Sequence, residues 1–159
     1  MKLNELNEAQ YYKNKDRYSM DDFVFGKTVR SQSLQRGMIL GIGRRSYNNR
    51  DGEPEGVYEI LGFTGNEQKY GEGGVKYNSA KEMYAANNVR SLRELEAKDD
   101  ENEYGYHHYI YARDLTDGDS GPWWYIMKGK WCEGSSAEPI FFREAKFKPK
   151  EDDRGLPSL

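Results

Sequence analysis

Glycines and arginines between Gly41 and Arg50 have the composition of a phosphate-binding turn. The run Gly41-Ile42-Gly43-Arg44-Arg45 follows an apolar segment, and Tyr47 and Arg50 lie just beyond it. Backbone amides and guanidinium groups bind phosphate oxygens, and a tyrosine ring stacks on bases. A dinucleotide-binding fingerprint would need a third glycine and a helix next, which this segment lacks. We expect a nucleic-acid contact, or else a basic strand end without a ligand, at the following residues: Arg36, Arg44, Arg45, Tyr47 and Arg50.

The densest aromatic stretch of the chain runs from Tyr104 to Cys132. Its two apolar runs flank a cluster of turn-forming residues at 116–122, and this pattern predicts a hairpin. Neighbouring Trp123 and Trp124 point to opposite faces of a strand, so we expect at least one in the core and the other at an interface. The aromatic residues assigned to this interface are Tyr109, Tyr111, Trp123, Trp124 and Trp131.

The turn at residues 118–122 contains a serine within a short motif. Gly118-Asp119-Ser120-Gly121-Pro122 is similar to the nucleophile motif of chymotrypsin-like serine proteases, but one glycine of that motif is missing. Nucleophilic catalysis also needs a base and an orienting group, and neither histidine lies in that family's upstream context. We therefore interpret Ser120 as a loop residue and assign no catalytic residue.

Residues of the types that bind metals do not have metal-site spacing. His107 and His108 are adjacent, so on a strand they face opposite ways, and Cys132 is the single cysteine. Asp114, Asp117 and Asp119 lack the closing glutamate of a calcium loop. We expect no metal and no cofactor.

The composition predicts a folded domain with an aromatic-rich core. Leu, Ile, Val and Phe make up only about 17% of the 159 residues, but 13 tyrosines and three tryptophans supply apolar area. The net charge is −3, with an excess of +5 in residues 1–50 and of −9 in residues 51–120. A chain without an apolar leader or a membrane-length segment is expected to be cytoplasmic.

Short strands separated by turns predict a mainly β protein. Strands are expected at residues 38–43, 57–63, 75–77 and 140–147, while residues 19–29 carry both a helix-cap pattern and a strand pattern. The order of the early strands resembles SH3-like or Tudor-like barrels over about 55 residues. We expect an α+β fold that consists of a small bent antiparallel sheet or an SH3-like barrel, two short helices and an aromatic-rich C-terminal hairpin sheet.

Two capping boxes predict the helices. Ser79 precedes Glu82 by three positions and Ser91 precedes Glu94 by three, so helices should begin at residues 80 and 92. The second should end in the acidic run 99–103, which we expect to be solvated. The predicted organisation is an arm or short helix at 1–18, one domain at 19–148 (barrel-like half 19–77, helices 79–98, aromatic sheet 104–148) and an irregular tail at 149–159.

These features favour a non-enzymatic, regulatory or accessory binding protein. The expected partner is nucleic acid or a nucleic-acid-associated protein, because the N-terminal third combines positive charge with interleaved tyrosines. One alternative is a structural or assembly subunit, or an inhibitor, that docks through the aromatic sheet. Another is an enzyme of a class that the motifs do not identify. The oligomeric state is left open.

Overall fold

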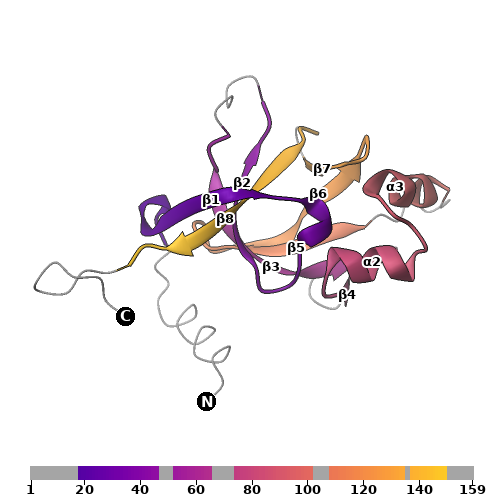
Figure 1. Ribbon diagram of the computed structural model, residues 1–159, viewed down its shortest axis with the longest axis horizontal. Helices are drawn as coiled ribbons and strands as arrows, with labels where there is room; N and C mark the ends of the chain where they lie inside the picture. Colours follow the sequence, from indigo (N-terminus) through magenta and orange to yellow (C-terminus); the bar gives the residue numbers. More distant parts are fainter. Residues whose placement is uncertain (1–17, 47–51, 66–73, 102–107, 135–136, 150–159) are drawn as a thin grey trace, which may run out of the picture.

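The computed structural model of the protein describes residues 18–46, 52–65, 74–101, 108–134 and 137–149 (Figure 1). The predicted arm at 1–18, except Tyr18, and most of the predicted tail at 149–159 lie outside these ranges, as do Tyr47 and Arg50. The described elements, in chain order, are η1 (Met20–Asp22), β1 (Phe23–Val29), η2 (Ser31–Ser33), β2 (Ile39–Arg44), β3 (Gly56–Thr64), β4 (Val75–Tyr77), α2 (Ala80–Ala86), α3 (Leu92–Asp100), β5 (Tyr109–Asp114), β6 (Ser120–Met127), β7 (Lys130–Glu133) and β8 (Ile140–Phe147).

All eight strands belong to one antiparallel sheet, in the order β1-β8-β2-β3-β5-β6-β7 with β4 beside β3. The last strand lies between the first two, so the N-terminal and C-terminal parts of the chain share one sheet. The prediction of a mainly β protein with two helices is confirmed. β8 has the predicted bounds, but it pairs with β1 and β2 rather than extending the aromatic hairpin.

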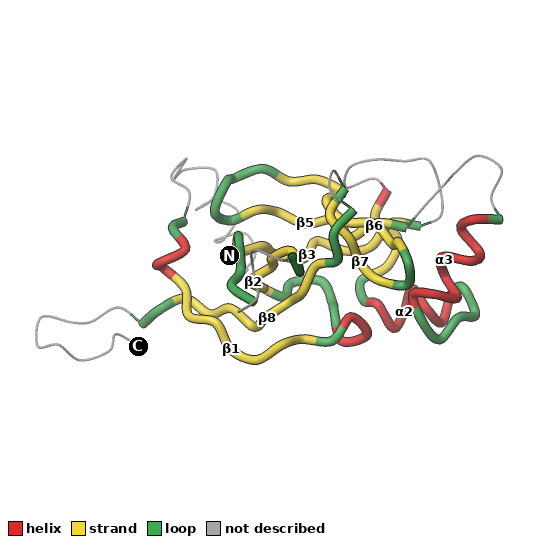
Figure 2. Tube along the Cα trace, turned by 90° about the horizontal axis from the view of Figure 1, so that it is seen from above, coloured by secondary structure: helices red, strands yellow, loops and turns green. Residues whose placement is uncertain are grey.

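The sheet is strongly bent but open. Figure 2 shows β1 and β8 on one side of the molecule and β5 and β6 on the other, with α2 and α3 at one end. A single bridge between Cys132 and Pro139 connects β7 to the start of β8, and no ladder follows it in the described residues. An SH3-like barrel is therefore not confirmed.

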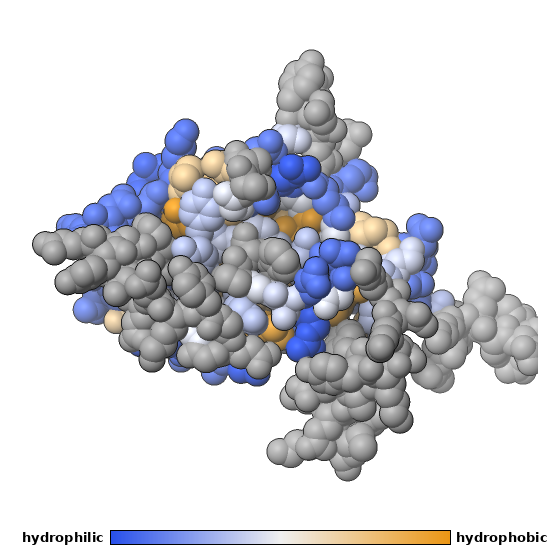
Figure 3. All heavy atoms as spheres, turned by 180° about the vertical axis from the view of Figure 1, so that it is seen from behind, coloured by the Kyte–Doolittle hydropathy of each residue, from blue (hydrophilic) through white to orange (hydrophobic). Residues whose placement is uncertain are grey.

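Two clusters of apolar side chains hold the fold together. The larger lies between the inner face of the sheet and the helices, and it includes Leu40, Ile60, Phe63, Met83, Leu95, Ile110, Trp124, Trp131 and Phe142. The smaller cluster, on the other face, contains Phe23, Val57, Leu115 and Ala145. Burial of each large apolar side chain contributes roughly 1.5–3 kcal/mol. Hydrophilic residues cover most of the described surface seen in Figure 3, with apolar patches between them.

The predicted helix caps are present. The Ser79 hydroxyl accepts a hydrogen bond from the Glu82 amide at 3.0 Å, and the Ser91 hydroxyl accepts one from the Glu94 amide at 3.2 Å. The conflicting signals at residues 19–29 are both correct, since Ser19 caps the one-turn η1 and β1 follows directly. The second helix ends at Asp100, within the predicted acidic run, but the expectation that this run is solvated is wrong at Asp99, which is 2% exposed.

The aromatic hairpin differs from its prediction at three points, of which the first is that Ser120, Gly121 and Pro122, predicted as turn or loop residues, already belong to β6. β5 and β6 form a hairpin, but the second apolar run divides into β6 and β7 at Lys128 and Gly129, where φ is 55° and 75°. Two successive residues with positive φ form the tight turn that suits a two-residue hairpin. The register also shifts between Ile110 and Tyr111, opposite Trp123, so strict alternation does not hold there.

Candidate functional site

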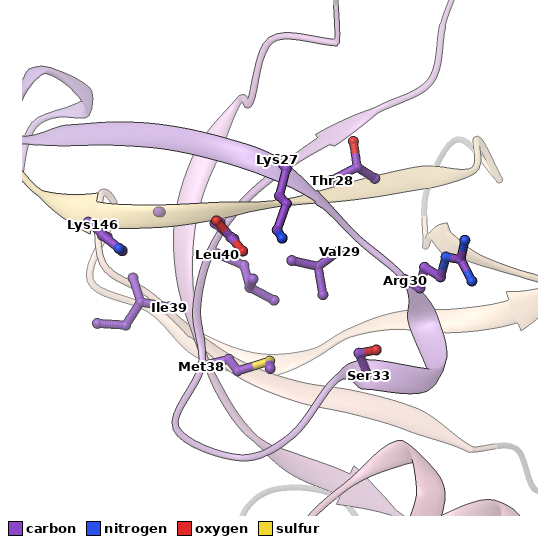
Figure 4. Close-up of a pocket in the computed structure, with 11 residues that line it drawn as sticks. Lys27, Thr28, Val29, Arg30, Ser33, Met38, Ile39, Leu40 and Lys146 are labelled. Atoms are coloured by element: carbon purple, nitrogen blue, oxygen red, sulfur yellow. The ribbon is translucent and has the colours of Figure 1, made fainter.

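A cleft of about 590 Å³ lies between β1, η2, β2 and β8 (Figure 4). Its volume is within the range of about 300–1,000 Å³ that is typical of ligand sites. The apolar part of the lining comes from Val29, Met38, Ile39, Leu40 and Ala145. Val29 and Met38 pack against the main core, so the cleft extends from the surface toward that core.

A bulge in β1 and a contact with Arg143 fix the position of β1 above the cleft. The β1–β8 register shifts between Phe25 and Thr28, which leaves one extra residue in β1 near Gly26 and Lys27. The Arg143 Nε donates a hydrogen bond of 2.9 Å to the Gly26 carbonyl, and its guanidinium lies 6.0 Å from the Phe25 ring centre. β1 is an edge strand, and these contacts attach it to β8.

Three cations line the cleft: Lys27, Arg30 and Lys146. All three are exposed. Figure 4 shows Lys146 and Arg30 toward opposite ends, with Lys27 between them. Within the described residues no ion pair holds any of the three, unlike Arg113, whose Nη1 lies 3.7 Å from Glu59. Cations without a carboxylate partner are available to an anionic ligand.

The arginines predicted from the sequence do not form one surface. Arg36 precedes β2, whereas Arg44 and Arg45 lie at its other end, and Tyr47 and Arg50 are outside the described residues. Arg44 Nε lies 3.0 Å from Glu55, and this carboxylate raises the pKa of the guanidinium. Arg45 lies over the Phe141 ring at 6.0 Å. Arg44 is therefore already paired, and Arg36 is separated from it by the length of β2.

The aromatic residues predicted as an interface lie mostly in the core. Trp124 is 3% exposed and Trp131 1%, and Tyr111 is also buried. Tyr109 is half-buried, and the side chain of Trp123 is outside the described part. Trp124 packs edge-to-face on Tyr58, with ring centres 4.7 Å apart. The buried rings stabilise the fold and cannot contact a partner without unfolding.

Apart from the cleft, a buried histidine and a buried aspartate form a hydrogen-bonded pair. The Asp99 carboxylate contacts His108 Nδ1 at 2.8 Å and also accepts the His108 backbone N–H at 3.2 Å. His108 Nε2 has no hydrogen-bond partner among the described atoms. His108 is 1% exposed, so a substrate in solution does not reach it. Ser120 lies at the opposite end of β5, paired with Arg113, and is not beside this histidine.

The described part of the chain shows no group of three or more residues suited to a metal ion. Burial raises the pKa of the Cys132 thiol, which disfavours the reactive thiolate. Neither described α-helix has the length and apolarity required to cross a bilayer.

A scan against models of protein families and searches of curated proteins and of solved structures found no match.

The cleft was not predicted from the sequence. Lys27 and Lys146 are far apart in the chain and meet only because β8 inserts beside β1. A local signal did exist in Phe23-Val24-Phe25-Gly26-Lys27, where a glycine interrupts an apolar strand and indicates a bulge. That signal does not indicate which strand pairs with β1.

Proposed function

We propose that this protein is a non-enzymatic binding module that engages single-stranded nucleic acid through the cleft beneath β1. The observation that supports this proposal most directly is the set of three exposed cations, Lys27, Arg30 and Lys146, none of them in an ion pair within the described chain. An excess of unpaired positive charge beside a cavity attracts anions.

The arrangement of these cations favours a polyanion over a single phosphate. Lys146, Lys27 and Arg30 follow one another along the cleft in Figure 4 instead of converging on one point. A row of cations suits the repeated phosphates of a nucleic-acid backbone, and each phosphate contact releases counterions. Three contacts to a single strand correspond to a slope of about −2 in a plot of log K against log salt concentration.

The apolar lining supports a single strand rather than a duplex. Val29, Met38 and Ile39, all half-buried, present aliphatic surface next to the cations. Bases of a single strand are unstacked easily and can enter such a cavity, whereas duplex bases are already stacked and paired. A cleft of about 590 Å³ is large enough for a base with its sugar.

The arginines at the two ends of β2 are proposed as flanking contacts. Arg45 and Arg36 are exposed, and a strand longer than the cleft could reach one of them. Arg44 would have to leave Glu55 to bind phosphate, so its contribution is expected to be small. We extend the same flanking role to Tyr47 and Arg50.

A charge-matched pair of variants tests the proposal. The cleft variant carries Lys27→Gln, Arg30→Gln and Lys146→Gln, and the control carries Lys81→Gln, Arg90→Gln and Lys130→Gln, which are also exposed cations. Binding of labelled nine-nucleotide oligothymidylate and oligouridylate is measured by fluorescence anisotropy at low salt. We expect the cleft variant to bind at least about tenfold more weakly than wild type, and the control less than about threefold. An absence of wild-type binding, or equal losses in both variants, would overturn the proposal.

A further inference from the structure

Glu144 is the one carboxylate among the residues that line the cleft. It pairs with Leu40 in the β2–β8 register, so its side chain lies on the same face of the sheet as that buried leucine. The side chain is half-buried, and within the described residues no hydrogen bond or ion pair holds its carboxylate. Its two oxygens are available as acceptors in a cleft whose other charged residues are cations.

Gly26 makes room for this carboxylate. A Cβ atom at position 26 would lie 2.6 Å from Glu144 Oε2, closer than real Cβ contacts, so the flexible end of the Glu144 side chain would have to move; it would also lie 3.2 Å from Glu144 Cβ, a tight contact. The Glu144 side chain therefore lies directly over the Gly26 backbone, at the point where β1 bulges.

A carboxylate repels phosphate, so in a DNA strand, which lacks the 2′-hydroxyl donor of RNA, its partner is a base with N–H donors. An ionised carboxylate only accepts hydrogen bonds. Guanine carries two adjacent donors, N1–H and N2–H₂, on its Watson–Crick edge, and they match the two oxygens of a carboxylate. Cytosine and adenine present one amino group next to an acceptor nitrogen, and thymine and uracil present one N–H between two carbonyl oxygens.

We infer that Glu144 is a specificity-determining residue that selects a guanine lodged in the cleft. This inference rests on the proposed function, because it needs a single strand whose phosphates lie along Lys27, Arg30 and Lys146. The backbone contacts position the strand, and the contact with Glu144 distinguishes the base.

Nine-nucleotide DNA strands of thymine with G, A, C or T at the central position test this inference. Wild-type protein should bind the G-containing strand about tenfold more tightly than the all-T strand. Glu144→Gln should bind the all-T strand somewhat more tightly, because a negative charge leaves the cleft, and should reduce the preference for G to about twofold or less. Glu101→Gln, an exposed charge-matched control on the far side of the fold, should keep the full preference.

The variant Gly26→Ala tests the position of the Glu144 carboxylate without changing its charge. This variant keeps the Glu144 carboxylate but displaces it, so the G preference should fall although the net charge is unchanged. Binding of all four strands without a G preference, or a preference that survives in Glu144→Gln, would overturn the inference and leave the proposed function intact. An absence of binding to any strand would overturn both.

Discussion

The imidazole Nδ1 of His108 lies 2.8 Å from Oδ1 of Asp99, and both side chains are almost completely buried. The Asp99 carboxylate also accepts a hydrogen bond from the His108 backbone N–H at 3.2 Å, and because an ionised carboxylate only accepts hydrogen bonds, Nδ1 is the donor in the ring contact. Because Asp99 lies in the last turn of α3 and His108 precedes β5, the pair attaches the end of the helix to the start of the strand.

Replacing Asp99 with alanine should strongly destabilise the protein. The substitution leaves the ring N–H and the backbone N–H of His108 buried without an acceptor, which costs about 3 kcal/mol of unfolding free energy. Urea denaturation followed by circular dichroism measures the change. Asp100→Ala removes a neighbouring exposed carboxylate and should change stability by less than about 0.5 kcal/mol. Equal effects of the two substitutions would contradict the structural role of Asp99.

Glu96 connects α3 to the β6–β7 turn. Its carboxylate oxygens accept hydrogen bonds from the backbone amides of Lys128 at 2.8 Å and Gly129 at 2.9 Å. Glu96→Ala should lower the unfolding free energy by about 1–2 kcal/mol, since both amides lose a charge-assisted hydrogen bond. Hydrogen exchange should show faster exchange of these two amides. Unchanged exchange in the variant would argue against this contact.

Two half-buried tyrosines predict a loss of stability at high pH. Burial raises the pKa of Tyr84 to about 12, and burial together with the Asp114 carboxylate raises the pKa of Tyr58 further. The unfolded state deprotonates near pH 10, before the folded state does, so the unfolded state binds fewer protons between about pH 10 and 12. Stability is complete below about pH 10 and should fall across this window, by roughly 1 kcal/mol for each tyrosine after allowance for solvent screening.

The double variant Tyr58→Phe and Tyr84→Phe provides the control for this pH dependence. Its unfolding free energy should change less between pH 10 and 12 than that of the wild-type protein. Parallel pH profiles would show that these two hydroxyls are not responsible.

Local patterns in the sequence predicted the elements that depend on neighbouring residues. The serine–glutamate boxes at Ser79 and Ser91 predicted where α2 and α3 begin, because a cap is a local hydrogen bond. The bounds of β4 and β8 were also predicted correctly from short apolar runs.

Properties that depend on contacts distant in sequence were not predictable in the same way. Asp99 belongs to an acidic run typical of a solvated loop, and only its contact with His108 explains its burial. Trp124 and Trp131 are of a residue type that is common at interfaces, yet both are enclosed in the main core. The cleft cations come together through the placement of β8 between β1 and β2, for which no local pattern exists.

An NMR titration of the protein with a single-stranded oligonucleotide tests the proposed site most directly. The account predicts that amide shifts concentrate at residues 27–30, 38–40 and 144–146, and that they weaken as salt concentration rises. No shifts at low salt, or shifts confined to positions outside the cleft, such as the helices α2 and α3, would contradict the assignment of nucleic-acid binding to the cleft beneath β1.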